Sequence, residues 1–421
     1  MSTDAVVLGL GYVGLPLAQE AVRSGVSVAG FDVSTAVVEG LNAGQTHIDD
    51  LSDADVGQMV QAGFRASTDE AVIGEAGVAV ICVPTPLSLE GSPDLGPIQA
   101  AAASVGRQLR PGMTVILQST TYPGTTEEVL VPLLEEGSGL TAGQDFHVAF
   151  SPERIDPGNA RFGMRNTPKV VGGLTPACTE AAAGFYARFV DEVVVAKGPR
   201  EAEMAKLLEN TYRHINIALV NEMARFAHEL DIDFWNVIEM AKTKPFGFQA
   251  FYPGTGVGGH CIPIDPNYLS YNVRTRLGYP FRFVELAQEI NATMPAYVAR
   301  RAQDILNDDA LAMRGAKVLL LGVTYKPDIA DQRESPAVPL AKALQAHGAQ
   351  VSFHDPNVTH WHVNTSQTLD RVEDLDAAIA GADLVIMVQD HAEYDIDALA
   401  KASKRFFDTK GKVTTPGAHR L

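Results

Sequence analysis

The sequence has little cysteine and little positive charge. Its three cysteines, Cys82, Cys178 and Cys261, are an odd and sparse set that does not suit a disulfide framework and fits a reducing compartment. No CxxC pair or His/Cys cluster has metal-ligand spacing, so we expect no metal. Lys and Arg number 33 against 51 Asp and Glu, and this net charge of −18 disfavours nucleic acid and anionic membranes as general partners.

Long hydrophobic runs are also missing. No apolar stretch reaches the roughly 20 residues that cross a bilayer, and the N-terminus enters an apolar strand without the basic region or cleavage site of a signal peptide. We therefore expect a soluble, cytoplasmic protein. The 421 residues, 46% of them hydrophobic, are enough for two or three domains with sizeable cores.

A glycine fingerprint follows the first apolar run. Residues 5–8 have the pattern of a buried parallel strand, and Gly9, Gly11 and Gly14 form GxGxxG before a helical stretch. These glycines allow a tight turn, close approach of a pyrophosphate and packing of helix on strand. Asp32 ends the second apolar run, 21 residues after Gly11, where a carboxylate accepts a bond from the ribose 2′-hydroxyl. Such a carboxylate repels a 2′-phosphate, so the sequence predicts binding of NAD rather than NADP.

Polar clusters follow three later apolar runs of the same region. They are Pro84–Pro86, Ser119–Gly124 and Ser151–Arg154. Open α/β sheets bind ligands beyond the carboxyl ends of their strands, so these clusters are expected at the site. Cys82 and Cys178 are interpreted as core residues.

A long helical stretch begins near Arg200. At 100° per residue, Lys206, Asn210 and Arg213 share one face, whereas Met204, Leu208, Ile215 and Leu219 share the opposite face. The polar face is either a solvated surface or part of a site. Further helical segments are predicted at 226–242 and 283–306, and the long helix is a plausible dimer contact.

Strand–helix alternation returns after residue 314. Apolar runs at 317–322, 351–355 and 382–388 predict a second Rossmann-type sheet without the full glycine fingerprint, and therefore no second dinucleotide. Lys326 and Arg333 follow its first strand and are either surface charges or ligands of a nucleotide diphosphate. The fold is predicted as α/β, with an NAD-binding Rossmann domain at 1–196, a central helical domain at 197–312 and a second, Rossmann-like domain at 313–421.

The loop Gly258–Pro266 carries the most reactive side chain. Cys261 follows a glycine pair and a histidine, and Asp265 comes four residues later. The glycines let a ligand or another backbone approach closely, and a cysteine thiolate is a strong nucleophile. A tight turn ending in a buried cysteine is the alternative interpretation.

Taken together, these motifs resemble the UDP-glucose/GDP-mannose dehydrogenase family, the nucleotide-sugar 6-dehydrogenases, over essentially the whole chain. The segments that carry the resemblance are 9–16, 84–86, 119–124, 151–154, 206–210, 256–266 and 325–336. The stretch 243–254 looks most like the UDP-N-acetylglucosamine 6-dehydrogenase branch, which usually has Pro-Gly-Pro-Gly where this chain has Thr255 between Gly254 and Gly256.

The resemblance implies a four-electron oxidation of a sugar CH₂OH to a carboxylate by two NAD, through a thiohemiacetal and a thioester on Cys261. It implies that Lys206 and Asn210 stabilise an oxyanion and that Asp265 orders a water and takes part in proton transfer. It further implies that Thr120 and the Lys206 ammonium share this water and that Glu153 is the base in thioester hydrolysis. Either Asp265 or Glu153 could be the initial base. The resemblance places NAD on Gly9, Gly11, Tyr12, Val13, Gly14, Asp32, Pro84, Thr85, Ser119, Thr120 and Arg333. It places the nucleotide sugar on Arg154, Ile155, Lys206, Asn210, Arg213, Phe251, Tyr252, Gly258, Tyr325 and Lys326. It also implies that the domain at 313–421 binds the nucleotide sugar and that the protein is a homodimer.

Several alternatives stay open on the sequence. UDP-glucose, dTDP-glucose and UDP-N-acetylmannosamine compete with UDP-N-acetylglucosamine as substrate. A two-electron β-hydroxyacid-type dehydrogenase also joins a Rossmann domain to a helical one, but it needs neither Cys261 nor residues 315–421. A non-enzymatic dinucleotide sensor would be marked by loss of Cys261 or Lys206, and both are present.

Overall fold

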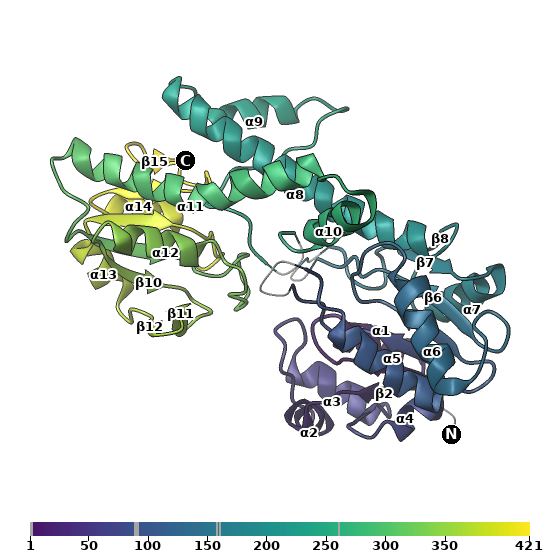
Figure 1. The fold of residues 1–421 in the computed structure, drawn as a ribbon. Coiled ribbons are helices and arrows are strands. Elements are labelled where there is room, and N and C mark those ends of the chain that lie inside the picture. The colour runs from purple at the N-terminus through teal and green to yellow at the C-terminus, as the bar shows by residue number, and fades with distance from the viewer. Residues whose placement is uncertain (1–2, 88–91, 157–158, 160, 260–261) are drawn as a thin grey trace. The chain divides into compact units, whose positions relative to one another are not determined.

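The computed structural model of the chain describes residues 3–87, 92–156, 159, 161–259 and 262–421 (Figure 1). It divides into two compact units. The N-terminal unit comprises 1–209 and 267–278, and the C-terminal unit comprises 210–266 and 279–421. Each unit contains one mainly parallel sheet, which confirms the predicted α/β class with two Rossmann-like sheets.

The sheet of the N-terminal unit has eight strands in the order β3-β2-β1-β4-β5-β6-β7-β8. All neighbours are parallel except β6 and β7. The chain order reverses beside β1, between β2 and β4, which makes the switch point where open α/β sheets bind ligands. The strands are β1 (Thr3–Leu8), β2 (Val28–Phe31), β3 (Arg65–Ser67), β4 (Ala76–Ile81), β5 (Thr114–Leu117), β6 (His147–Phe150), β7 (Lys169–Gly173) and β8 (Val193–Val195).

Helices cover both faces of this sheet because successive strand residues point to opposite sides. Val7 joins a core with helices α1 and α7, whereas its neighbour Leu8 joins a separate core with α5 and α6. The helical elements are α1 (Gly14–Arg23), α2 (Thr35–Asn42), α3 (Asp53–Gln61), α4 (Ala71–Gly74), α5 (Gly96–Gln108), the π-helix η1 (Thr126–Leu130), α6 (Val131–Ser138) and α7 (Pro176–Tyr186).

The helices that follow are α8 (Pro199–Glu229), α9 (Phe234–Lys242), α10 (Asp265–Leu277) and α11 (Arg282–Asp308). The sequence predicts helical stretches over α8, α9 and α11, whereas α10 was not predicted. The expected continuous helical segment at 226–242 is wrong in one respect, because residues 230–233 interrupt it. Asp231 has a left-handed φ of 55°, and the Asp233 side chain accepts a hydrogen bond from Asn236 N as the N-cap of α9.

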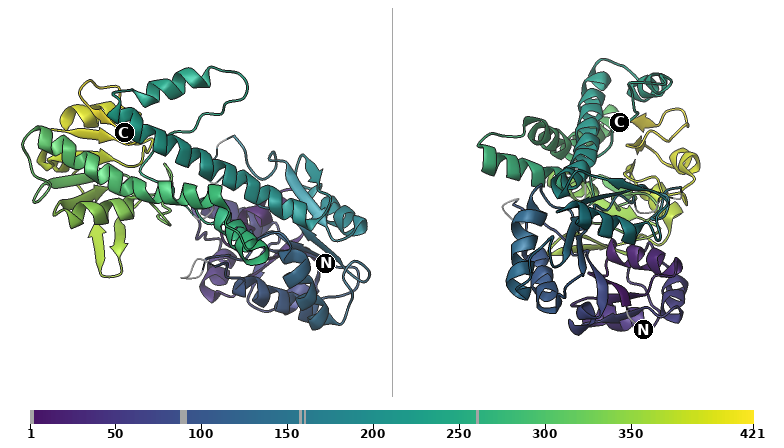
Figure 2. Two further views of the ribbon diagram at one scale, coloured as in Figure 1. Left: turned by 45° about the horizontal axis from the view of Figure 1, so that its top comes forward. Right: turned by 90° about the vertical axis from the view of Figure 1, so that its right-hand side faces the viewer.

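The sheet of the C-terminal unit has five parallel strands in the order β10-β9-β13-β14-β15. Its strands are β9 (Lys317–Leu321), β10 (Gln350–His354), β13 (Leu384–Met387), β14 (Phe406–Asp408) and β15 (His419–Arg420). Helices α12 (Ala337–Ala346), α13 (Leu375–Gly381) and α14 (Ile396–Ala402) accompany it. A hairpin of β11 (His360–Asn364) and β12 (Gln367–Asp370) projects beside this sheet (Figure 2).

Candidate active site

The glycine fingerprint lies at the carboxyl end of β1. Gly9 has a φ of 87°, a left-handed conformation that glycine adopts without strain. A Cβ on Gly14 would come within 1.9 Å of the Gly9 carbonyl oxygen, whereas a Cβ on Gly11 would meet no atom within 4 Å. Gly14 is therefore needed for packing of α1 on β1, and the space beside Gly11 fits the approach of a pyrophosphate to the backbone.

Asp32 stands at the carboxyl end of β2 beside this turn. Its carboxylate accepts hydrogen bonds from Leu10 N and Ser34 N, each at 2.9 Å, and its side chain keeps partial exposure. Carboxylate oxygens have about four acceptor sites, so two backbone donors leave capacity for ribose hydroxyls. Tyr12 and Val13 lie in the same turn before α1, and Val13 is the N-cap residue of that helix.

The loops after β4 and β5 are fixed by polar contacts. Ser119 Oγ donates to Val83 O at 2.7 Å. Tyr268 Oη, from α10, donates to Thr85 O at 2.6 Å and to Pro86 O at 3.1 Å. Tyr268 is fully buried, and its partners lie more than 180 residues away in the sequence, so no local pattern indicates this contact. The predicted site residue Pro84 lies in the first of these loops, and Thr120, which is partly buried, lies in the second.

Glu153 lies in the loop after β6, within a network of buried groups. Its Oε1 accepts from Arg154 N and Ile155 N, both at 2.7 Å. Its Oε2 accepts from Gln118 Nε2 at 2.7 Å and from Lys169 Nζ at 3.2 Å. These four donors match the usual acceptor capacity of a carboxylate. A base role for Glu153 would therefore require one of these bonds to be released.

The network continues behind Glu153. Tyr186 Oη donates to Gln118 Oε1 at 2.7 Å, and Lys169 Nζ lies 5.2 Å from the centroid of the Tyr186 ring. Burial raises the pKa of the Tyr186 hydroxyl well above its usual value, so Tyr186 is a donor at neutral pH. Arg154 itself donates to Pro168 O at 2.7 Å and pairs with Glu209 at 2.8 Å.

Glu203, in the first turns of α8, is a second buried carboxylate that the sequence interpretation missed. It is fully buried and accepts hydrogen bonds from Gly124 N at 2.6 Å, Thr126 N at 2.9 Å and Thr126 Oγ1 at 2.7 Å. Burial raises its pKa to about 7, against the opposing effect of these bonds. It ties α8 to the end of the loop that carries Ser119 and Thr120.

The polar face of α8 is mostly buried. Lys206 is 8% exposed and Asn210 is 4% exposed, which favours the site interpretation over a solvated face. Asn210 Nδ2 donates to Asp265 Oδ2 at 2.5 Å, and Asp265 is 3% exposed. Arg213 differs, because its side chain is exposed, and the next buried residue on this face is His214.

Cys261 and His260 lie outside the described residues, whereas the glycines before them are described. A Cβ on Gly258 would lie 2.8 Å from Glu334 O, and one on Gly259 would lie 2.7 Å from the Tyr325 ring. Gly259 N also donates to Arg333 O at 3.2 Å. The glycine pair is therefore required by close packing against the loop after β9, which carries the predicted nucleotide-sugar ligands.

Of the other predicted ligand residues in the C-terminal unit, Phe251 and Tyr252 pack beside α8 and α9, and Arg333 lies in the loop after β9. Phe251 packs edge-on against Tyr212 at 5.7 Å, and Tyr252 stacks on Trp235 at 6.1 Å and donates to Glu239 Oε1 at 2.8 Å. Arg333 makes a bidentate contact with Asp331, with nitrogen–oxygen distances of 2.6 to 3.0 Å.

A cavity of about 380 Å³ adjoins the glycine loop within the C-terminal unit. Its lining includes His214, Val257, Pro263 and Gln288. His214 is 1% exposed, neither of its ring nitrogens has a hydrogen-bond partner, and burial lowers its pKa to about 4. The imidazole is therefore neutral at pH 7. His214 was also missed by the sequence interpretation, since a histidine one turn after Asn210 carries no distinctive pattern.

Comparison with known proteins completes this description. Three domain models of the UDP-glucose/GDP-mannose dehydrogenase family match the chain: the NAD binding domain at 3–190, the central domain at 200–293 and the UDP binding domain at 319–416. The chain belongs to this family. It is therefore an oxidoreductase of the NAD-dependent nucleotide-sugar dehydrogenases, with their three-domain architecture.

Individual relatives span almost the full chain. A UDP-N-acetyl-D-mannosamine dehydrogenase from Salmonella typhimurium is 34% identical over 97% of this chain and 99% of its own length. A UDP-N-acetyl-D-glucosamine 6-dehydrogenase from Pseudomonas aeruginosa is 37% identical over 84% of this chain and 82% of its own. The solved structure of a UDP-D-ManNAc dehydrogenase from Pyrococcus horikoshii has a TM-score of 0.90, 31% identity and 99% coverage of both chains.

A metal-ligand cluster and a membrane-spanning helix are both absent from the described residues. Within the ranges that the structure describes, no three His, Cys, Asp or Glu side chains are grouped as metal ligands. Among the helices of those same ranges, none has both the length and the apolar character needed to span a bilayer.

Proposed function

We propose that this protein oxidises carbon 6 of UDP-N-acetylglucosamine to a carboxylate with two NAD. The observation that carries the proposal is the buried Asn210–Asp265 hydrogen bond. Asn210 lies on α8 together with buried Lys206, and Asp265 is the first residue of α10, the helix that follows Cys261 in the sequence. The motif at 243–254 and the 37% identical P. aeruginosa relative support the glucosamine substrate. The chain's family membership supports NAD as the cofactor.

The chemistry requires two hydride transfers separated by an addition. NAD supplies the hydride acceptor in both. The first transfer converts CH₂OH to an aldehyde with release of one proton. The Cys261 thiol then adds to the aldehyde carbon, and the resulting thiohemiacetal loses the second hydride and a proton to leave a thioester. Water cleaves the thioester, giving the acid and the free thiol.

Each named residue has a role in this scheme. Lys206 and Asn210 donate to the oxyanion that develops on the substrate, and their burial strengthens that interaction. Asp265 is oriented by Asn210 and takes the proton. Glu153, already holding four donors, orients Gln118 and Lys169 and acts as a base in hydrolysis only after releasing one of them. Thr120 shares the ordered water.

We assign the binding residues to three domains, at 1–196, 197–312 and 313–421. The ranges matched by the three family domain models support these boundaries. Gly9, Gly11, Tyr12, Val13, Gly14, Asp32, Pro84, Thr85, Ser119, Thr120 and Arg333 bind NAD. Arg154, Ile155, Arg213, Phe251, Tyr252, Gly258, Tyr325 and Lys326 bind the nucleotide sugar. Cations near the diphosphate offset the repulsion between a dianionic ligand and a chain of net charge −18.

UDP-N-acetylmannosamine is a second candidate substrate. Relatives from S. typhimurium and P. horikoshii that bear this substrate's name cover at least 92% of the chain at 34–35% identity. The two sugars differ only in the configuration at C2, so the proposed reaction at C6 is the same for both.

A donor screen tests the proposal. UDP-N-acetylglucosamine, UDP-N-acetylmannosamine, UDP-glucose and dTDP-glucose are each incubated with NAD, and NADH absorbance is followed to completion. We expect the highest kcat/KM with UDP-N-acetylglucosamine and two NADH per sugar. One NADH per sugar would indicate a two-electron dehydrogenase, and no NADH with any donor would indicate a non-enzymatic nucleotide-binding protein.

We also propose a homodimer through the apolar face of α8. Met204, Leu208, Tyr212, Leu219 and Phe226 lie within about 80° of each other around the helix at 100° per residue. Their exposed fractions are between 43% and 65%. An apolar stripe of this length on a free surface is typical of a protein–protein interface.

A further inference from the structure

The C-terminal sheet repeats the ribose-binding turn of the N-terminal sheet. In the N-terminal unit, Gly9 has a φ of 87° and donates to Phe31 O at 2.9 Å, and Leu10 N and Ser34 N donate to Asp32. In the C-terminal unit, Gly322 has a φ of 75° and donates to His354 O at 2.9 Å.

The carboxylate of the second turn is held in the same way. Val323 N donates to Asp355 Oδ2 at 2.7 Å, and Asn357 N donates to Asp355 Oδ1 at 2.9 Å. Asp355 therefore occupies the position that Asp32 has in the first sheet. The two differ in burial, because Asp32 is partly exposed whereas Asp355 is completely buried.

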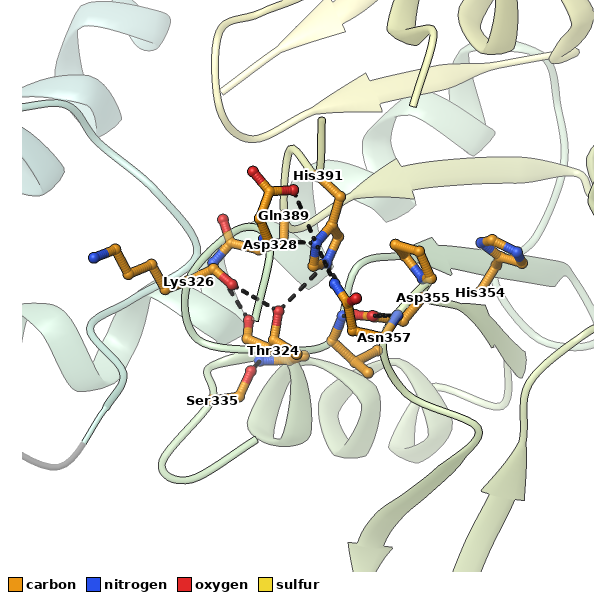
Figure 3. Close-up of polar contacts among 12 residues, drawn as sticks. Thr324, Lys326, Asp328, Ser335, His354, Asp355, Asn357, Gln389 and His391 are labelled. Carbon is orange, nitrogen blue, oxygen red and sulfur yellow. Dashed lines mark hydrogen bonds and ion pairs between the residues drawn. The ribbon is translucent and has the colours of Figure 1, made fainter. Parts of the chain in front are cut away.

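His391 is a buried residue that contacts the Asp355 carboxylate. It follows β13, the strand that lies beside β9 as β4 lies beside β1. The backbone hydrogen bond from Cys82 N to Leu8 O in the first sheet matches the one from Val388 N to Leu321 O in the second. Thr85 lies three residues after Cys82, and His391 lies three residues after Val388, so the two residues correspond. His391 Nε2 is 3.1 Å from Asp355 Oδ2 and 3.3 Å from Thr324 Oγ1 (Figure 3). The imidazole thus fills the space that a ribose takes in a dinucleotide-binding sheet.

The other ring nitrogen holds the loop after β9. His391 Nδ1 accepts from Asp328 N at 2.9 Å, which places the ring proton on Nε2, where it faces Asp355. Asp328 Oδ1 in turn accepts from Ala392 N at 2.7 Å. Asp328 has a left-handed φ of 63°, a conformation that costs a non-glycine residue energy and needs support from its surroundings.

This loop carries the proposed ligands of the nucleotide sugar. Lys326 is two residues before Asp328, its carbonyl accepts from Thr324 Oγ1 at 2.8 Å, and its side chain extends away from the His391 cluster (Figure 3). Tyr325 packs against Gly258 and Gly259, immediately before the catalytic loop. Fixing Asp328 therefore fixes the backbone from which Tyr325 and Lys326 project.

We propose that His391 is a positioning residue for the nucleotide sugar: it occupies the ribose place on Asp355 and pins the loop that presents Tyr325 and Lys326. This inference rests on the proposed function of that loop. It also gives a physical reason to expect no dinucleotide at the C-terminal sheet, since His391 lies against the carboxylate that corresponds to Asp32.

The substitutions His391→Asn and His391→Gln separate the contact of Nδ1 with Asp328 N from the contact of Nε2 with Asp355. Asparagine places its carbonyl oxygen near Nδ1 and can accept from Asp328 N, whereas glutamine places its amide nitrogen near Nε2 and can donate to Asp355. The matched control is His362→Asn, because His362 is exposed on the β11–β12 hairpin, where its ring contacts Thr368 Oγ1 at 2.8 Å.

The variants are compared by steady-state kinetics, thermal unfolding and calorimetric titration with UDP. Loss of one hydrogen bond is worth up to about tenfold in affinity, so we expect His391→Gln to raise KM for the sugar about 5- to 10-fold and to weaken UDP binding similarly. Its kcat and its KM for NAD should stay within about twofold. His391→Asn should unfold at a lower temperature yet bind UDP within about threefold of wild type.

A third variant covers the case in which the His391 variants fail to fold. The Asp328 side chain is 58% exposed, so Asp328→Ala should fold, and loss of its bond to Ala392 N should weaken UDP binding about threefold. Unchanged UDP binding in His391→Gln, or in Asp328→Ala if the former does not fold, would overturn the inference. Equal weakening in both His391 variants would overturn it as well. Wild-type protein that binds UDP but oxidises no donor would instead contradict the proposed function.

Discussion

At the residue scale, the proposed reaction depends most on Cys261. The nucleophile is required only after the first hydride transfer, because an aldehyde has no readily transferred hydride until a group adds to it. Neither NAD nor the sugar needs the thiol for binding in this scheme. Binding and acid formation can therefore be separated by one substitution.

We expect Cys261→Ala to form no sugar acid and to yield at most one NADH per sugar, with an unchanged NAD dissociation constant. Product analysis by mass spectrometry and NAD titration by fluorescence measure these. Cys178→Ala is the control, because Cys178 is fully buried in α7 and should leave the yield at two NADH. Full acid formation by Cys261→Ala would exclude the covalent route.

Glu203 predicts a pH dependence of stability. Burial raises its pKa from 4.5 to about 7 in the folded protein. The folded state then binds more protons than the unfolded state between these values, so the contribution of Glu203 to stability falls as pH rises through that window.

The amide of Glu203→Gln does not ionise, so this variant lacks the pH-dependent contribution of the Glu203 carboxyl group. The unfolding free energy of the wild type relative to the variant should fall between about pH 5 and pH 7, at up to about 1.4 kcal/mol per pH unit. Urea unfolding across this range measures it, with Glu39→Gln on the exposed surface of α2 as the control. A difference that does not vary with pH would show that Glu203 stays ionised throughout.

At the scale of elements, two glycines of the β1–α1 turn have different roles: Gly14 is needed for helix packing and Gly11 for the approach of NAD. Gly14 contacts the Gly9 carbonyl so closely that any Cβ would displace α1, whereas Gly11 faces open space. The same GxGxxG pattern therefore contains two physically different requirements.

We expect Gly14→Ala to lower the melting temperature strongly. Gly11→Ala should melt close to the wild type but raise KM for NAD by at least about tenfold, because its methyl group takes the space of the pyrophosphate. Calorimetric melting curves and NAD kinetics give both numbers. A Gly11→Ala variant with unaltered NAD kinetics would place the cofactor elsewhere.

At the scale of the whole molecule, the exposed apolar face of α8 predicts self-association. Leu219 is 51% exposed near the middle of this face. A buried unpaired guanidinium is costly, so Leu219→Arg should convert a dimer to a monomer in sedimentation velocity. Val33→Arg, at a residue that is 87% exposed in the N-terminal unit, should leave the dimer intact. Wild-type protein that sediments as a monomer would contradict this interface.

Much of the fold was available from local patterns. The apolar runs at 5–8, 317–322 and 382–388 predicted β1, β9 and β13, and α8 begins within one residue of its expected start. The break at 230–233 was missed because it depends on one aspartate in a left-handed conformation and another acting as a cap. Helical periodicity alone is a weak guide to such a break.

The sequence by itself determined the family chemistry: the glycine fingerprint, Asp32, the Lys206–Asn210 spacing and Cys261 are defined by short-range order along the chain. The tertiary structure alone decided the neighbours of these groups. Glu153 with Lys169, Tyr268 with Thr85 and His391 with Asp355 are joined from 16 to 183 residues apart. Their effects come from burial and from hydrogen bonds across the sheets, and no spacing in the sequence encodes either.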